Sequence, residues 1–313
     1  MSAMLSGLSV LDCSRGDGET CARFLESLGA GLRAGEAADA GAATCDFLIL
    51  GAVDAARAEA LAQQHDRLIV VVITPFGRSG PRAHYLGGEL VASAMSGALR
   101  ACGYPDRAPV KEAGDACWFH ANAMAAAGAL FALNERDQSG RGQIVDVSVQ
   151  EVAASRMTNG ILSWQFDQRL LMRSGPKLNY GIASVRCVWD LADGYVFHSL
   201  MTGRFGAPAN KALSEWMDER GADNPMRDVD WLRYDRSALP EDTRAVWEAA
   251  MAAFFKTLTK AEIADEGRRR GINATAVNEP ADLLRDTHLA ARNFFAEASI
   301  GGRMVRAPAR FVR

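Results

Sequence analysis

The stretch RLIVVVITPFG, residues 67–77, is a run of β-branched residues that ends in Pro-Phe-Gly. A continuous apolar run of this kind predicts a strand that is buried on both faces of a sheet. Two similar runs precede it, LSVLDCS at 8–14 and CDFLILGA at 45–52, and helix-like segments lie between the runs at 20–30 and 54–64. Strands that alternate with helices predict an α/β fold, with an open, mostly parallel, Rossmann-like sheet and helices on both of its faces.

The carboxyl ends of these strands are the expected ligand-binding edge. Ser14, Gly51 and Thr74 end the three runs. The loops after them therefore lie where open α/β sheets bind ligands. Further along the chain, we expect one helix at about 87–100 and a buried Ala-rich helix at 121–136.

A change in composition predicts a second, inserted domain. Residues 185–200 read as two strands joined by the turn Ala192–Asp193–Gly194, which is close to a hairpin signature. We therefore expect a large α/β domain over 1–184, a small α+β domain over 185–275 and a return to the large domain over 276–313. The Gly- and Pro-rich residues 172–184 are expected to form a linker or an exposed loop.

Composition narrows the class of protein. The net charge of −3 gives no reason to expect nucleic acid or an anionic membrane as a partner. Six scattered cysteines without a CxxC pair indicate reduced thiols rather than a disulfide framework or a metal site. The N-terminus lacks a signal-peptide pattern, and we expect no membrane-spanning segment, so a cytoplasmic protein is predicted.

The segment AGDACWFHANAM, residues 113–124, places four chemically active groups within six positions. They are a carboxylate at Asp115, a thiol at Cys117, an indole at Trp118 and an imidazole at His120. The segment is either an active site or the ordinary start of a buried helix. Cys117 is either a nucleophile or a small buried hydrophobic side chain, and His120 is either a base or a packed histidine.

Several stretches together resemble the class III CoA-transferases, a family that includes formyl-CoA transferase, carnitine CoA-transferase and the α-methylacyl-CoA racemases. In chain order they are VLDCSR (10–15), ITPFGRSGPRAHYLGGELVASAMSGAL (73–99), APVKEAG (108–114), GALFALNERDQSGRGQIVDVSVQEV (128–152), CVWDLADGYV (187–196), GINATAVNEPADLLRDTHLAARNFF (271–295) and RAPARF (306–311). The resemblance implies a CoA-binding domain built from both chain ends, a small inserted domain and an interlocked dimer. It also implies coenzyme A or an acyl-CoA as substrate, with no metal.

The resemblance also implies a mechanism, in which a family aspartate attacks the thioester and CoA then passes to a free carboxylate. Such a nucleophile must be poorly solvated and must have N–H donors near the developing oxyanion. The position 22 residues before Gly140 and nine after Pro109, where the family keeps this aspartate, is Trp118. An indole cannot form an acyl anhydride. Asp115, three residues earlier, is either a displaced nucleophile or the N-cap of the following helix.

Racemase chemistry is not expected, because Gly88 replaces the histidine that the family's racemases use as a base. For CoA binding, the resemblance points to Arg15 and Gly18 in the first loop, although Glu19 brings a negative charge there. Arg78 and Arg82 are further candidates for holding a polyanionic ligand. The alternative for each arginine is a solvated loop side chain.

Three hypotheses follow for the function. The first is an active CoA-transferase that acts on an acyl-CoA thioester with Asp115 as the nucleophile. The second is a non-catalytic member that supports a longer paralogue in a hetero-oligomer or binds an acyl-CoA without turning it over. The expected assembly is a homodimer or a hetero-oligomer with a longer paralogue. The third is new chemistry on a CoA thioester, such as that of a hydratase or a lyase.

Overall fold

The computed structural model describes residues 4–35, 38–180, 183–297 and 303–305. The chain forms two compact units: unit 1 is Met1–Arg173 with Arg292–Arg313, and unit 2 is Ser174–Ala291. The domain division expected from the sequence, at 184 and 275, stays a prediction. The motif RAPARF lies outside the described residues.

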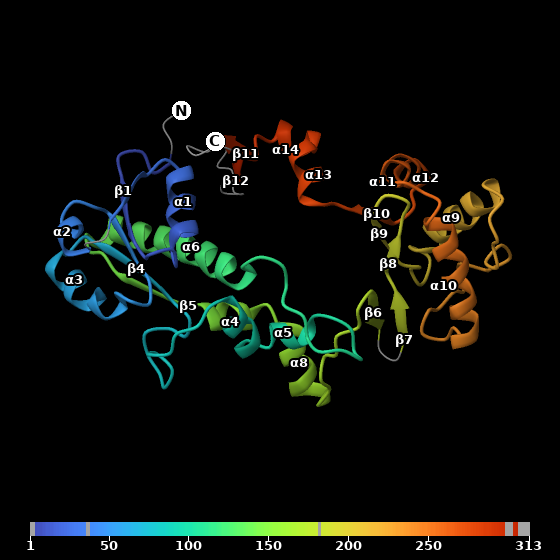
Figure 1. Ribbon diagram of the computed structural model, residues 1–313, viewed down its shortest axis with the longest axis horizontal. Coiled ribbons are helices and arrows are strands. Elements are labelled where there is room, and N and C mark those ends of the chain that lie inside the picture. The colour runs from blue at the N-terminus through green and yellow to red at the C-terminus, as the bar shows by residue number, and fades with distance from the viewer. Residues whose placement is uncertain (1–3, 36–37, 181–182, 298–302, 306–313) are drawn as a thin grey trace. The chain divides into compact units, whose positions relative to one another are not determined.

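Unit 1 is built around a parallel sheet of five strands in the order β2-β1-β3-β4-β5 (Figure 1). The strands are β1 (Ser9–Cys13), β2 (Gly31–Ala34), β3 (Phe47–Leu50), β4 (Ile69–Thr74) and β5 (Ile144–Ser148). Every residue of β3 and β4 is buried, as expected for continuous apolar runs with neighbours on both sides. The prediction of an open parallel α/β sheet is confirmed.

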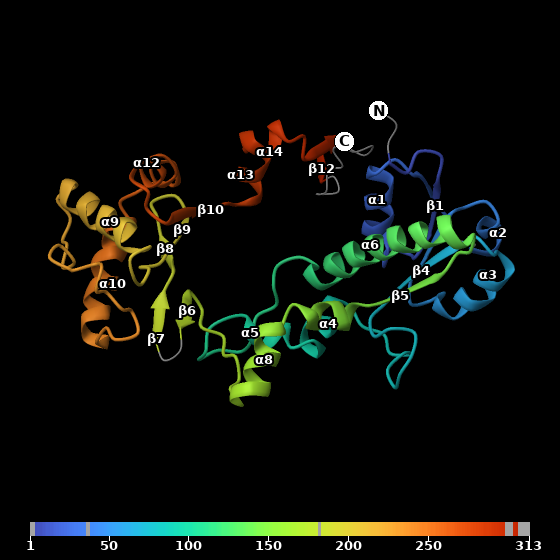
Figure 2. The ribbon, with the colours of Figure 1, turned by 180° about the vertical axis from the view of Figure 1, so that it is seen from behind.

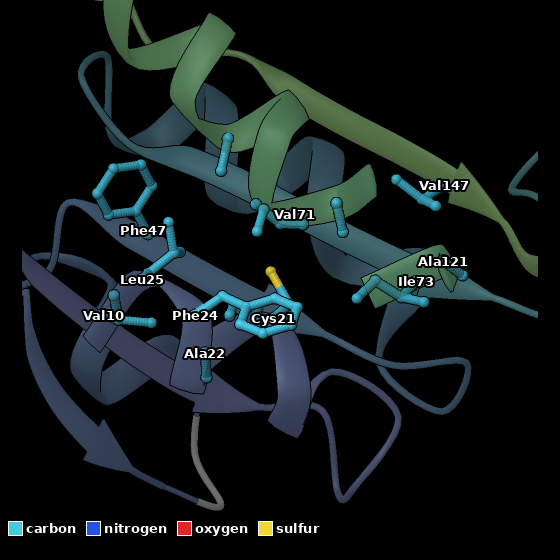
Figure 3. Close-up of a cluster of buried hydrophobic side chains, with 14 of the residues drawn as sticks. Val10, Cys21, Ala22, Phe24, Leu25, Phe47, Val71, Ile73, Ala121 and Val147 are labelled. Atoms are coloured by element: carbon cyan, nitrogen blue, oxygen red, sulfur yellow. The ribbon is translucent and has the colours of Figure 1, made fainter. Parts of the chain in front are cut away.

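Two layers of helix cover this sheet. On one face lie α1 (Glu19–Ser27) and α6 (Ala116–Ser139), and on the other lie α2 (Ala38–Ala42), η1 (Ala55–Arg57) and α3 (Ala58–Gln64). Successive side chains of a strand point to opposite faces, so Val71 and Ile73 pack under α1 and α6 (Figure 3), whereas Val70 and Val72 pack under α2 and α3. Both faces are therefore apolar and dry.

The helix expected over 87–100 is two helices. They are α4 (Glu89–Met95) and α5 (Ala98–Ala101), and Gly97 between them has a φ of 87°. A left-handed residue stops an α-helix, and glycine adopts that conformation without strain. After β5 the chain continues through α7 (Val149–Ser155) and α8 (Thr158–Asp167).

Helix α6 runs along the sheet as the longest element of unit 1 (Figure 1). By length and composition alone it could cross a membrane, contrary to our reading of the sequence. Its contacts are those of a core helix, because Ala121, Ala125 and Ala129 are fully buried against α1 and the sheet. Arg136 near its end is also buried and pairs with Asp46 at 3.2 Å.

Unit 2 combines a three-stranded antiparallel sheet with helices (Figure 2). Its strands are β8 (Val188–Asp190), β9 (Tyr195–His198) and β10 (Ala274–Val277), beside a hairpin of β6 (Lys177–Tyr180) and β7 (Ala183–Arg186). Its helices are α9 (Ala207–Glu219), α10 (Glu241–Phe255), α11 (Lys260–Glu262), the π-helical turn η2 (Ile263–Gly267), α12 (Arg268–Arg270), α13 (Pro280–Arg285) and α14 (Thr287–Ala291). The predicted hairpin around 192–194 is confirmed, whereas part of the expected loop 172–184 is strand β6. The last described pair of strands, β11 (Phe295–Glu297) and β12 (Arg303–Val305), belongs to unit 1.

A buried histidine makes the stability of unit 2 depend on pH. The His198 side chain is completely buried, its Nδ1 lies 2.8 Å from the Asn273 carbonyl oxygen, and burial lowers its pKa to about 4. Between pH 6.5 and 4 the unfolded chain binds a proton at this site and the folded chain does not. We therefore expect the free energy of unfolding of unit 2 to fall by roughly 3 kcal/mol as the pH drops through this window.

Urea denaturation at several pH values, followed by tryptophan fluorescence, measures this dependence. His198→Gln should flatten the decline in stability between pH 6.5 and 4. His288→Gln, at an exposed histidine of the same unit, should leave it unchanged. The same pH dependence in the wild type and in His198→Gln would contradict the prediction.

Candidate functional site

A cleft of about 790 Å³ opens in unit 1 beside the carboxyl ends of the strands. Its walls come from three chain segments: 16–20 after β1, 87–89 at the start of α4, and 113–122 at the start of α6. This edge of the sheet is the one that the sequence predicts for ligand binding. Segments that are far apart in sequence therefore meet at one site.

The first wall is a tight loop that requires small residues. The Ser14 hydroxyl donates to the Asp12 carboxylate at 2.6 Å and accepts a bond from the Gly18 N–H at 2.8 Å. A Cβ on Gly18 would come within 2.4 Å of Cγ2 of Ile49, so glycine is required by packing. Arg15 sits in the left-handed region with a φ of 58°. The loop thus turns back on itself to begin α1.

Asn122 joins this loop to α6. Its Oδ1 accepts a bond from the Cys21 N–H at 2.9 Å, and its Nδ2 donates to the carbonyls of Asp17 (2.9 Å) and Trp118 (3.0 Å). The Asn122 side chain is buried, so water cannot take its place as the partner of these three backbone groups. This role of Asn122 was not predicted, because a single amide side chain in an Ala-rich helix does not indicate which groups it will bond.

Replacing Asn122 with leucine is expected to destabilise unit 1 by about 3 kcal/mol, because one buried and two partly buried backbone groups lose their partner at once. The loop 16–20 should also become more accessible to hydrogen exchange. Asn134→Leu, at an exposed position of the same helix, serves as the control. Chemical denaturation and amide exchange of both variants test the prediction, and equal stability of the two would refute it.

Glu89 holds the amino end of α6. Its carboxylate accepts bonds from the N–H of Cys117 (3.0 and 3.1 Å) and from the N–H of Trp118 (3.2 Å). A carboxylate at this place neutralises unpaired amides and the positive end of the helix dipole. No local sequence pattern indicates this role, because the bonds join residues 28 and 29 positions apart.

Asp115 stands at the N-cap position of α6 without acting as a side-chain cap. Its side chain makes no capping hydrogen bond, and the Cys117 and Trp118 amides at this end of the helix donate to Glu89 instead. The residue is exposed and lines the cleft. Among the described residues its carboxylate has no hydrogen-bond or ion-pair partner.

Trp118 and Phe119 form an aromatic wall of the cleft. Trp118 is half-buried and packs against the core cluster under α1 and α6. Phe119 is exposed to 46% and meets the ring of Phe24 edge-on, with the centroids 5.7 Å apart. The indole at the expected nucleophile position therefore both lines the cleft and anchors its wall.

The other two groups of the segment 113–124 are not arranged as a nucleophile and its base. Cys117 is fully buried, and burial, followed by the hydrogen bond to Glu89, raises the pKa of its thiol to about 11. At neutral pH it is a thiol and a poor nucleophile. His120 lines the cleft, and its Nδ1 lies 2.6 Å from the Ala116 carbonyl oxygen, to which it donates.

The residues predicted to bind CoA are dispersed. Gly18 shapes the first loop beside the cleft. Arg15 is exposed and pairs with Asp54 at 3.4 Å. The Arg78 guanidinium pairs with Glu59, and Arg82 is exposed in a turn. The structure thus brings the first loop to the cleft, and the described lining includes none of the three arginines.

Asp17 in the first loop is also among the residues that line the cleft. Asp17 is half-buried, and burial raises the pKa of its side chain, although the Ala52 N–H donates to Oδ2 at 3.1 Å and opposes this. The cleft therefore has three acidic residues, Asp17, Glu89 and Asp115. Across the described part of the chain, no group of three or more His, Cys, Asp and Glu side chains is placed to hold a metal ion.

Comparison with known proteins relates the chain to CoA-transferases. A family model described as CoA-transferase family III matches residues 55–313. The succinyl-CoA:(R)-benzylsuccinate CoA-transferase subunit BbsE of Thauera aromatica is 31% identical over 76% of this chain and 57% of its own length. Succinyl-CoA–D-citramalate CoA-transferase of Chloroflexus aurantiacus is 28% identical over 72% and 53%, and the beta subunit of succinyl-CoA–L-malate CoA-transferase from that organism is 24% identical over 75% and 56%. The chain spans about half the length of these curated relatives.

Solved structures share the fold. A CaiB/BaiF family protein from Brucella suis superposes with a TM-score of 0.80 and 19% identity, over 99% of this chain and 93% of that one. The protein Rv3272 from Mycobacterium tuberculosis superposes with a TM-score of 0.69 and 17% identity, with the same coverage. At these identities the likeness concerns the fold alone.

Proposed function

The chain belongs to CoA-transferase family III, and from this premise we propose that it is a subunit of a CoA-transferase that holds an acyl-CoA thioester in the cleft. The nucleophilic carboxylate is supplied by a second, different chain. The product of the assembled enzyme is a new CoA thioester formed on a carboxylic acid. The cellular location proposed for this assembly is the cytoplasm.

The observation that carries the proposal is the state of the amino end of α6. Transfer through an acyl anhydride needs a carboxylate beside N–H groups that can receive the oxyanion. Here Trp118 stands where the resemblance places the nucleophile, and its own N–H and that of Cys117 are already bonded to Glu89. A cleft that is open but lacks free donors there suits binding better than attack on a thioester.

The relatives support a two-chain enzyme. BbsE is named as a subunit, and so is the matched malate CoA-transferase beta chain. We therefore place this chain in a hetero-oligomer with a longer paralogue, and a homodimer is the alternative assembly. The interlocking of chains expected from the family stays a prediction.

One feature favours a second candidate, an active chain with Asp115 as the nucleophile. The Asp115 carboxylate lines the cleft and has no partner among the described residues, so it is free to react. In this version an Asp115 oxygen attacks the thioester carbonyl. The C–S bond breaks, the CoA thiolate departs, and an aspartyl–acyl anhydride is formed. The thiolate then attacks the aspartyl carbonyl, and the released acyl carboxylate departs.

Hydroxylamine trapping separates the two candidates. The purified chain, alone and together with its paralogue, is incubated with an acyl-CoA and hydroxylamine, and peptides are analysed by mass spectrometry. We expect thioester binding by the chain, no hydroxamate at Asp115, and a hydroxamate on a carboxylate of the paralogue. Asp115→Asn should leave the turnover of the complex unchanged.

Each other outcome has a definite meaning. A hydroxamate at Asp115 that disappears in Asp115→Asn establishes the second candidate. Failure of the chain to bind any CoA thioester, alone or in the complex, overturns both.

A further inference from the structure

We infer that the cleft takes a CoA thioester with an uncharged, apolar or aromatic acyl group and disfavours one whose acyl group ends in a carboxylate. This inference rests on the proposed function, since it names the substrate class of the same cleft. It differs from what the names of the curated relatives would suggest, because those relatives use succinyl-CoA.

The lining of the cleft is acidic. Each of its three wall segments contributes one acidic residue, namely Asp17, Glu89 and Asp115. Within the described residues, no lysine or arginine contributes to the lining. A second carboxylate brought in by the acyl group would meet like charges in a partly desolvated space, without a cation to pair with it.

The amino end of α6, the natural anion site beside the cleft, is already occupied. The amino end of a long helix such as α6 attracts anions through its free N–H groups and its dipole. Glu89 already occupies this place, with its two oxygens 3.0 to 3.2 Å from the amides of Cys117 and Trp118. A carboxylate of the substrate would have to displace a covalently tethered one.

The cations close to the cleft are also engaged. Lys111 donates to the carbonyls of Glu112 and Gly114 in the loop that leads to Asp115. Arg156, which approaches His120 within 3.2 Å, pairs with the Glu112 carboxylate. Arg15, which precedes the first wall segment in the chain, pairs with Asp54. Recruiting any of them for a ligand carboxylate would break an existing interaction.

The aromatic wall of the cleft also favours an apolar acyl group. Trp118 and Phe119 present two rings to the cleft, and contacts with the core and with Phe24 fix their positions. Rings in a partly buried wall gain from covering an apolar or aromatic group, through area burial and edge or face contacts. The cleft therefore favours an apolar or aromatic acyl group and repels one that carries a carboxylate.

A matched pair of ligands tests this inference. Butyryl-CoA and succinyl-CoA both carry four-carbon acyl groups and differ in whether the acyl chain ends in a methyl group or a carboxylate. Calorimetric titration of the full chain, repeated on its complex if it is isolated as one, should give at least about tenfold tighter binding of butyryl-CoA. A 3-phenylpropanoyl thioester should bind at least as tightly as butyryl-CoA.

Glu89→Gln is the sharpest variant, because glutamine keeps an acceptor for the amides and removes the charge. We expect it to bring the affinity for succinyl-CoA up by about fivefold or more while changing that for butyryl-CoA by less than about twofold. Glu135→Gln, at an exposed glutamate near the far end of α6, should change neither. Asp17→Asn replaces Glu89→Gln if circular dichroism shows the latter misfolded, with the same expected direction.

Two results must be kept apart. Binding of succinyl-CoA as tight as that of butyryl-CoA, or no gain on removal of either charge, overturns the inference and leaves the proposed function standing. Absence of binding for all three thioesters overturns the proposed function itself.

Discussion

Trp118→Asp is expected to change the chain from one that acquires no acyl label into one that hydroxylamine traps at position 118, at a low rate because Glu89 still holds the nearby amides. The position is the third residue of α6 and lines the cleft. A carboxylate in the first turn of a helix is stabilised by the dipole. Removing the half-buried indole costs about 2–3 kcal/mol of stability, so the variant should remain folded at low temperature.

Trp118→Asn is the matched control, since asparagine has the same size and shape as aspartate and cannot form an anhydride. Both variants are incubated with butyryl-CoA and hydroxylamine, and the label is located by mass spectrometry. Label in the aspartate variant only would mean that the chain lost its nucleophile by substitution at this one position. A folded aspartate variant that binds the thioester and stays unlabelled would argue against Trp118 as the occupant of the nucleophile position.

Gly142→Ala is expected to destabilise unit 1 by about 3–5 kcal/mol, among the largest effects of a single methyl group in this chain. An ideal Cβ at Gly142 would lie 1.9 Å from the Leu68 carbonyl oxygen and 2.4 Å from its carbon. Both are backbone atoms, so no side chain can turn aside to make room. The same glycine donates its N–H to the Asp66 carbonyl at 2.7 Å, which fixes it where β5 begins to pair with β4.

Thermal and urea denaturation of unit 1 measure this effect. Gly88→Ala is the comparison, because no atom lies within 4 Å of the Cβ it would add and its φ of −93° suits any residue. We expect this variant to match the wild type within about 0.5 kcal/mol. Equal stability of Gly142→Ala and Gly88→Ala would show that β5 can move away from β4 without cost.

The sequence predicts the sheet well where burial alone decides it. The runs that become β1, β3 and β4 are apolar because both faces of the sheet are covered, and that composition is visible in the letters. Strand β2 has the sequence GLRA and is only partly buried, so its conformation comes from pairing with β1 at the edge of the sheet. Pairing of that kind leaves no local pattern.

The general place of the cleft could be predicted from the sequence, but the hydrogen bonds and ion pairs around it could not. The loop after Ser14, one of the three that the sequence predicts at the ligand-binding edge, lines the cleft. Glu89 takes the amides that Asp115 would have capped, and this depends on how α4 meets α6 in space. Arg78, which the sequence suggests for a polyanionic ligand, has its guanidinium on Glu59, 19 residues away. Both outcomes are set by tertiary contacts.

The division of unit 1 into two chain segments has a consequence for biosynthesis. Residues 174–291, all of unit 2, separate Met1–Arg173 from Arg292–Arg313. At ribosomal rates of about 5–20 residues per second, unit 1 waits roughly 6–24 s for its last segment. Unit 2 is continuous and can fold during that delay. The nascent unit 1 therefore stays incomplete for as long as unit 2 is being synthesised.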